Sequence, residues 1–202
     1  MNRHRIMPAL VLRLRPFGES NKEAVFLTPE EGIVRAVVYG GAKSKLRAYV
    51  SPFQTGTLYL YGAKGQDKVS DFDVRAWRPE LRELLERVRA AAFICGAALD
   101  GEGGGVMSGA AFALANACLD ALQGADSFMS EKIRVHFLWN WLEILGLRPE
   151  FTEDPFLDTD AVEYLRMTEG LPPSAIGDYS LGSSSFARLA GFLDGYLREA
   201  SK

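Results

Sequence analysis

Histidine, cysteine and long apolar runs are scarce in this chain of 202 residues, and each scarcity excludes a class of function. The two histidines, His4 and His136, lie far apart, and neither has an acidic or nucleophilic neighbour at a catalytic spacing. No HExxH, GxSxG or Walker-type segment occurs. Cys95 and Cys118 lie in separate apolar stretches, which predicts buried free thiols instead of a disulfide or a metal pair. We therefore predict a protein that is not an enzyme and that uses no cofactor or metal.

The hydropathy of the chain argues against insertion into a membrane. No apolar run approaches the roughly 18 residues that a membrane span requires. The first ten residues, MNRHRIMPAL, lack the apolar core and cleavage site of a signal peptide. We therefore expect a cytoplasmic protein without a membrane partner.

Charge is distributed unevenly between the two parts of the chain. Residues 1–78 contain 13 Lys/Arg and 7 Asp/Glu, a net charge of +6, and residues 79–202 contain 10 and 19, a net charge of −9. Such asymmetry is typical of a module that faces a polyanion, joined to a second unit. Lysines placed on exposed strand edges for solubility are the alternative explanation.

The basic part has the periodicity of a small β-barrel. Residues 7–18 alternate, with Leu10, Leu12 and Leu14 on one face and Val11, Arg13 and Arg15 on the other. Further strands are predicted over residues 24–27, 33–39, 56–61 and 68–77. Five short strands in fewer than 80 residues favour a Greek-key barrel of the oligonucleotide-binding (OB) type over a sandwich.

The central hairpin of this barrel, residues 23–47, ends in a basic arm. Its turn, residues 28–32, contains Pro29, which presets one turn dihedral, and Gly32, which can adopt a positive φ. Beyond the second strand, Lys43, Lys45 and Arg47 occupy every second position, so an extended arm would direct all three to the same side. The pattern predicts a row of cations.

A helical period replaces the alternating one at Pro79. Helices are predicted over residues 79–99, 108–122, 130–145, 159–168 and 184–200. In the third of these, Arg134, His136 and Trp139 are expected at the margin of an apolar stripe. The fold class is thus α+β, with an OB-type barrel over residues 1–78 and an all-α domain over residues 79–202.

Single strands bind OB barrels through a cationic groove and through aromatic rings on which bases stack. The barrel supplies both kinds of side chain. The candidate DNA-binding residues are Arg13, Arg15, Lys22, Arg35, Lys43, Lys45, Arg47, Tyr59, Tyr61 and Arg75.

Several of these segments resemble a known family. The shared positions are Val11-Leu12, Pro16 to Ser20, Leu27 to Glu30 with Gly32, Val37-Val38, Gly40, Ala42-Lys43, Pro52-Phe53, Phe137 to Leu142 and Leu145 to Glu150. Their order and spacing are similar to those of the recombination and DNA repair mediator RecO.

The resemblance implies an OB domain followed by a helical domain, and a mediator that is not an enzyme. Its family members bind single- and double-stranded DNA, anneal complementary strands coated with single-strand-binding protein, and act with RecR to load RecA, with RecF as a further partner. Many carry a four-cysteine zinc finger, whereas residues 151–155 here contain no cysteine, so no zinc is expected.

The family also engages the acidic C-terminal tail of single-strand-binding protein, which ends in a hydrophobic residue. Such a ligand requires an apolar pocket with a cation at its rim. On the third predicted helix, Lys132, Arg134, Phe137 and Trp141 are candidates for this partner site.

Two other functions remain open from the residues alone. A general single-stranded RNA-binding OB protein would share the barrel and its charge. A hydrolase or transferase would use the acidic cluster of Glu153, Asp154, Asp158 and Asp160, although its spacing is not that of an EF-hand and favours a solvated loop.

Overall fold

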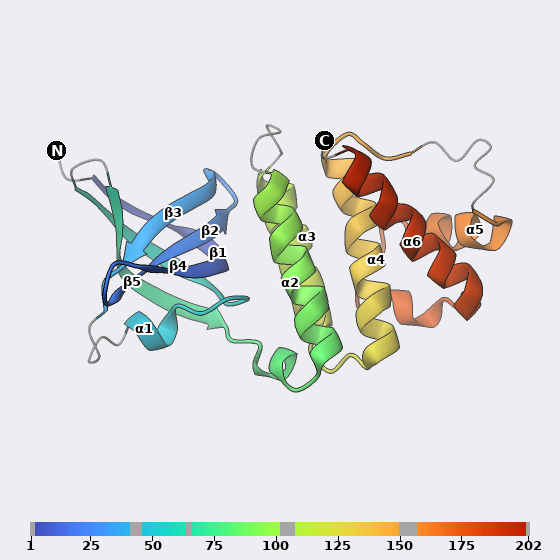
Figure 1. Ribbon diagram of the computed structural model, residues 1–202, viewed down its shortest axis with the longest axis horizontal. Helices are drawn as coiled ribbons and strands as arrows, with labels where there is room; N and C mark the ends of the chain where they lie inside the picture. Colours follow the sequence, from blue (N-terminus) through green and yellow to red (C-terminus); the bar gives the residue numbers. More distant parts are fainter. Residues whose placement is uncertain (1–2, 41–45, 64–65, 102–107, 150–156, 201–202) are drawn as a thin grey trace.

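The computed structural model describes residues 3–40, 46–63, 66–101, 108–149 and 157–200, which form a β-barrel followed by a layered group of helices (Figure 1). The strands are β1 (Arg3–Phe17), β2 (Asn21–Thr28), β3 (Gly32–Val38), β4 (Thr55–Ala63) and β5 (Gln66–Ala76). The helices are α1 (Leu46–Tyr49), α2 (Leu85–Asp100), α3 (Ser108–Ala121), α4 (Ser127–Ile144), α5 (Thr159–Thr168) and α6 (Ser183–Ala200), with 3₁₀ turns η1 (Pro79–Arg82) and η3 (Ile176–Asp178). None of the helices described here combines the length and apolar character that crossing a bilayer would need.

The five strands close into a barrel in the order β1-β2-β3-β5-β4, which confirms the predicted OB-type architecture. The long strand β1 pairs with β4 through its first half and with β2 through its second half. A parallel pair between Val37 and Lys68 joins β3 to β5. Leu46 of the short helix α1 and Val50, directly after it, pack against the core of the barrel. Every strand therefore has a partner on both sides, and the barrel has an inner and an outer face.

The predicted alternation of β1 is wrong around residue 12, because the strand contains a β-bulge there. The register shifts between Val11 and Arg13, so Leu12 is an extra residue without a partner on β2. Leu10 and Leu12 point outward and pack against helices, whereas Val11 and Leu14 point into the barrel. One inserted residue thus moves Leu14 to the opposite face from Leu12.

The β2–β3 turn has the predicted geometry, whereas the one described residue of the predicted cationic row, Arg47, lies in a helix. Gly32 has a φ of 68°, and the Thr28 hydroxyl donates to its carbonyl oxygen at 3.0 Å. The helix that contains Arg47 is α1, so Arg47 is not part of an extended segment. Lys43 and Lys45 lie outside the described residues.

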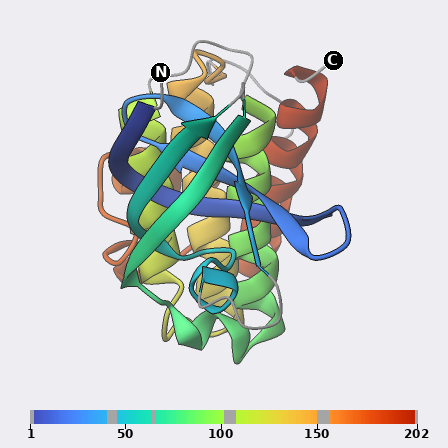
Figure 2. The same cartoon turned by 90° about the vertical axis from the view of Figure 1, so that its left-hand side faces the viewer.

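Helices α2 and α3 stand directly behind the barrel, and α4 is the central helix of the second lobe (Figures 1 and 2). The predicted first helix begins later than expected, since residues 79–82 form a 3₁₀ turn and Leu84 is extended, with α2 starting at Leu85. Cys95 and Cys118, on α2 and α3, are buried free thiols as predicted. Burial raises the pKa of the Cys95 thiol to about 12, so this thiol stays protonated at neutral pH.

Helix α4 is buried on two sides, which corrects the predicted margin. Phe137 and Trp141 belong to the core shared with α2, α3 and the barrel, whereas Leu138 and Trp139 belong to a second core formed with α5 and α6. His136 and Trp139 are only 5% and 4% exposed. A helix between two layers has two apolar faces, so hydrophobic periodicity could not locate its margin.

Arg78 joins the barrel to the helices. Its guanidinium, 1% exposed, donates to the Phe53 carbonyl at 2.7 Å and to the Thr55 hydroxyl at 2.9 Å on the barrel side. On α3 it donates to Asn116 Oδ1 at 2.9 Å and to Asp120 Oδ1 at 2.6 Å. Arg78 has a φ of 47°, in the left-handed region that non-glycine residues rarely adopt. The one side chain therefore satisfies acceptors from both lobes.

Replacing Arg78 by methionine should lower the free energy of unfolding by about 3 kcal/mol, because it leaves buried acceptors without a donor. Urea denaturation followed by circular dichroism measures the change. The exposed Arg89 on α2 is the matched control, and Arg89→Met should change stability by no more than about 0.5 kcal/mol. Equal losses in the two variants would contradict a structural role for Arg78.

His136 makes stability depend on pH. Burial lowers the pKa of His136 from 6.5 to about 4, and the backbone of Leu171 only partly offsets the effect. The unfolded state therefore binds a proton that the folded state rejects, so stability is complete above pH 6.5 and is lost as the pH falls towards 4. Between pH 7.5 and 5 this group should remove about 2 kcal/mol. The measured pH dependence of urea unfolding should be smaller by that amount in His136→Gln, and an unchanged dependence would refute the assignment.

Candidate nucleic-acid interface

The outer face of β1, β2 and β3 has an apolar half and a basic half. In the apolar half, Leu10, Leu12, Leu27 and Ile33 pack against the helices. Beyond it, Arg13 on β1 and Arg35 on β3 both lie opposite Val25 of the intervening strand β2. Adjacent strands are about 4.8 Å apart, so Arg13 and Arg35 begin about 10 Å from each other on one surface. Both arginines are exposed.

Arg15 and Lys22 extend this surface towards the β1–β2 turn. Arg15 pairs with Glu23 across the strands, with 2.5 Å between Nε and Oε2. Glu23 is the single acidic residue within β2, β3 and the second half of β1. We call Arg13, Arg15, Lys22 and Arg35 the basic face. Its net charge, with Glu23 included, is +3, which favours contact with a polyanion.

A second group of side chains lies where β3 ends. Cross-strand pairing sets His4, Tyr61 and Lys68 in one row over β1, β4 and β5. The ammonium of Lys68 lies 4.8 Å from the centre of the Tyr39 ring, and the His4 and Tyr61 rings are 5.3 Å apart. We call these four residues the aromatic–lysine cluster. It combines ring faces for base stacking with a cation for phosphate, the pairing that single-strand binding needs.

Strand β3 connects the basic face to the aromatic–lysine cluster. Arg35, Val37 and Tyr39 follow one another at every second position, so all three are expected on the outer face. Tyr61 was predicted from the sequence as a DNA-binding residue, but Lys68 and His4 were missed. The sequence placed Lys68 at the start of a predicted strand but gave no sign of its neighbours. Lys68 lies close to Tyr39 only because β5 pairs in parallel with β3.

Tyr59 and Arg75 were also predicted to bind DNA. Tyr59 lies two residues before Tyr61, on the same outer face of β4. Tyr59 is directly opposite Asp71, and both line a groove that Asp73 also lines. Carboxylates repel phosphate, so Tyr59 is a weaker candidate for DNA contact than Tyr61, which lies opposite Lys68. Arg75 is exposed at a β-bulge near the end of β5. It lies between Val74, which pairs with Gly56, and Ala76, which pairs with Thr55.

The four residues predicted to bind a partner peptide do not meet at one surface. Phe137 and Trp141 are 0% and 2% exposed and stack on each other with their ring centres 5.6 Å apart. The Lys132 ammonium donates to the Tyr179 carbonyl at 2.6 Å, and Arg134 forms ion pairs with Glu131 and Asp194. Each of the four has a structural partner, so the prediction of a peptide site here receives no support from the geometry.

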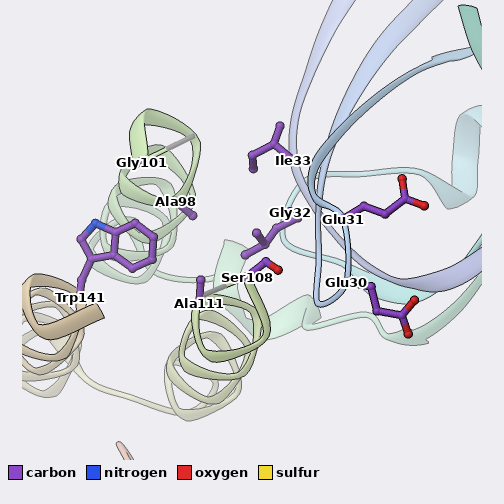
Figure 3. A pocket seen from close by; sticks show the side chains of 10 residues that line it. Glu30, Glu31, Gly32, Ile33, Ala98, Gly101, Ser108, Ala111 and Trp141 are labelled. Atoms are coloured by element: carbon purple, nitrogen blue, oxygen red, sulfur yellow. The ribbon is translucent and has the colours of Figure 1, made fainter. Parts of the chain in front are cut away.

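A cavity of about 390 Å³ separates the β2–β3 turn from α2, α3 and α4. In Figure 3 the Trp141 ring and Ile33 approach it from opposite sides, and the Glu30 and Glu31 carboxylates lie on the barrel side, away from the ring. Carboxylates at the barrel edge make this cavity unsuited to phosphate.

The acidic cluster predicted as an alternative catalytic or metal site is not assembled among the described residues. Asp158 caps α5 by accepting a hydrogen bond from Ala161 N at 2.9 Å. Its hydrogen bond with Ser185, supported by Ala161 N and Arg188, lowers the pKa of Asp158 to about 2. Glu153 and Asp154 lie outside the described residues, and the described ones contain no group of three possible metal ligands.

Sequence comparison agrees with the architecture. Residues 1–76 match the family described as "Recombination protein O N terminal". The chain is 34% identical over 88 residues to a "DNA repair protein RecO" of Pelotomaculum thermopropionicum, covering 43% of this chain and 34% of that protein. For the proteins with the same name from Gloeobacter violaceus and Exiguobacterium sp., identity is 28% over 141 residues and 27% over 146 residues. These matches cover 69% and 71% of this chain but 54% and 57% of the relatives.

The two longer matches extend beyond the barrel, since 141 and 146 aligned residues exceed the 76 of the N-terminal family. The first 76 residues therefore match the N-terminal domain of RecO proteins, and the chain is similar to RecO relatives over a little more than half of their length.

Proposed function

We propose that this protein is a DNA repair and recombination mediator that binds single- and double-stranded DNA through the basic face of its barrel. The observation that supports it most is the row of Arg13 and Arg35 on one exposed sheet surface, within the segment that matches the RecO N-terminal family. The relatives named above are DNA repair proteins. The role is non-enzymatic, because bringing two complementary strands together requires only that their repulsion be reduced.

The mechanism follows from the charge of the interface. Cations on the basic face neutralise phosphates of one strand and release its counterions, which lowers the barrier to approach of a second strand. Tyr39 and Tyr61 hold unpaired bases by stacking until pairing replaces that contact. Base pairing then provides the free energy, so annealing needs no nucleotide hydrolysis.

The cellular role would follow the family. The protein would anneal complementary strands coated with single-strand-binding protein and help load RecA together with RecR in the cytoplasm, with RecF as a further partner. Lys43, Lys45 and Arg47 remain proposed DNA contacts, as does Arg75. Contact with the tail of single-strand-binding protein is part of the proposal, without residues assigned to it.

The charge-neutral double variant R13Q/R35Q tests the basic face. Each lost phosphate contact should reduce the salt dependence of single-strand affinity by about 0.7 log units per log unit of salt, or about 1.4 for both. Fluorescence anisotropy with a labelled oligothymidylate at several salt concentrations gives the slope. Annealing of complementary oligonucleotides precoated with single-strand-binding protein should slow in the same variant.

The matched control is R89Q/R166Q, which removes the same charge from exposed arginines on α2 and α5. It should retain the wild-type slope and annealing rate. Equal loss in both variants would show an effect of net charge alone, and wild-type protein that fails to accelerate annealing would refute the mediator function. Tighter binding of RNA than of DNA of equal sequence would favour the general RNA-binding alternative.

Variants of two tyrosines on β4 distinguish the contribution of base stacking to DNA affinity from that of charge. Tyr61→Leu should weaken oligothymidylate binding by about 1 to 3 kcal/mol without changing the salt slope, because it removes a stacking surface and no cation. Tyr59→Leu, two residues away on the same strand, should bind as wild type, since Tyr59 faces Asp71. The same anisotropy titration measures both, and a larger effect at Tyr59 would place the bases on the other flank of the barrel.

A further inference from the structure

An open groove of aromatic and acidic side chains lies on the barrel flank formed by β4, β5 and α1. Tyr49, Tyr59 and Trp77 supply rings, and Asp71 and Asp73 supply carboxylates, around a volume of about 450 Å³. Tyr49 and Trp77 are 41% and 48% exposed, and their rings meet edge to face with centres 6.1 Å apart. Two large exposed rings in contact with each other form an apolar patch of the kind that marks interaction sites.

The local register of β5 directs both carboxylates into this groove. Leu60 pairs with Val69 and Tyr59 pairs with Asp71, so Ser70 is an extra residue between them. The Ser70 hydroxyl donates to the Tyr59 carbonyl at 3.1 Å and holds the bulge. Val69 and Phe72 both point into the barrel as a result, and Asp71 and Asp73 both point outward.

The groove has the chemistry of a site for organic cations. Ring faces attract ammonium and guanidinium groups through their quadrupoles, and adjacent carboxylates supply the counter-charge. Ion pairs within the described part of the chain do not involve Asp71 or Asp73; Asp71 Oδ1 accepts only from the backbone N–H of Phe72, at 2.8 Å. Both carboxylates are exposed and available to a partner.

We propose that this groove docks an extended, basic segment of a partner protein, with arginine or lysine side chains at alternate positions. Asp71 and Asp73 are two residues apart on one strand face, which spaces them by about 6.6 Å. Side chains at positions i and i+2 of an extended segment have the same spacing. The aromatic rings cover the aliphatic stems of the bound side chains, and the carboxylates pair with their charged ends.

This docking site is independent of the basic face. The basic face lies on β1, β2 and β3, whereas the groove lies on β4, β5 and α1, with opposite charge. One barrel can therefore hold a nucleic acid and a protein at the same time. Nucleic acid is disfavoured in the groove because both carboxylates oppose phosphate.

The test uses the full chain and a fluorescein-labelled peptide, Gly-Arg-Gly-Arg-Gly, amidated at its C-terminus. Fluorescence anisotropy at low salt should show binding that D71N/D73N weakens about fivefold or more, as expected for two exposed ion pairs. Trp77→Leu should weaken it as well, without any change in charge. The control D160N/E163Q changes the net charge equally at exposed residues of α5 and should bind the peptide as wild type.

A nitrogen-15 NMR titration locates the contact. The peptide should shift the indole N–H signal of Trp77, and an oligothymidylate should not. Failure of the peptide to bind, equal binding to D71N/D73N, or a Trp77 shift caused by the oligothymidylate alone would each overturn the proposal. Because D71N/D73N should retain wild-type DNA affinity, failure here is distinguishable from failure of the DNA-binding function.

Discussion

The buried guanidinium of Arg78 constrains how the two lobes are arranged. It donates to Phe53 and Thr55 on the barrel and to Asn116 and Asp120 on α3. A buried cation is tolerated only where hydrogen bonds and a counter-charge replace water, so this geometry leaves little freedom at the junction. Phe53 and Arg78 both have a positive φ, at 73° and 47°, which shows that the surrounding contacts outweigh a local backbone cost.

The hydrophobic core shared by the barrel and the helices also constrains how the two lobes are arranged. Three leucines on the outer face of the barrel, Leu10, Leu12 and Leu27, pack in the core formed with α2, α3 and α4. The helices thereby cover the apolar half of the outer face of β1 to β3 and leave its basic half open. The position of the interface is thus a consequence of which part of the barrel the helices bury.

Closure of the barrel gives its remaining surface two different flanks. Arg13 and Arg35 face outward on one side, and Asp71 and Asp73 face outward on the other, because each strand directs alternate residues away from the core. The overall positive charge of residues 1–78 concealed this separation. A site assembled from all cations and tyrosines of the domain therefore combined residues such as Tyr59 and Arg13 that belong to different surfaces.

Periodicity predicted the five strands and five main helices well because each of them has a local apolar repeat. It failed where a neighbour distant in sequence set the environment. Leu12 is accommodated by a bulge that is evident only in its pairing with β2, and His136 is buried only because α4 lies between two layers. Single-sided burial was the wrong assumption for α4, and it also made Lys132 and Arg134 appear available to a partner.

The amino-acid sequence by itself determined the strands, the helices, the turn at Gly32, the buried thiols and the excess of cations in the first 78 residues. These features depend on local spacing and on residue type, which a linear pattern carries. Only the tertiary structure decided that Lys68 lies over Tyr39, that Arg13 and Arg35 share a surface, and that Tyr59 faces Asp71. Each of those relations joins residues on different strands, and strand order and register exist only after the barrel has closed.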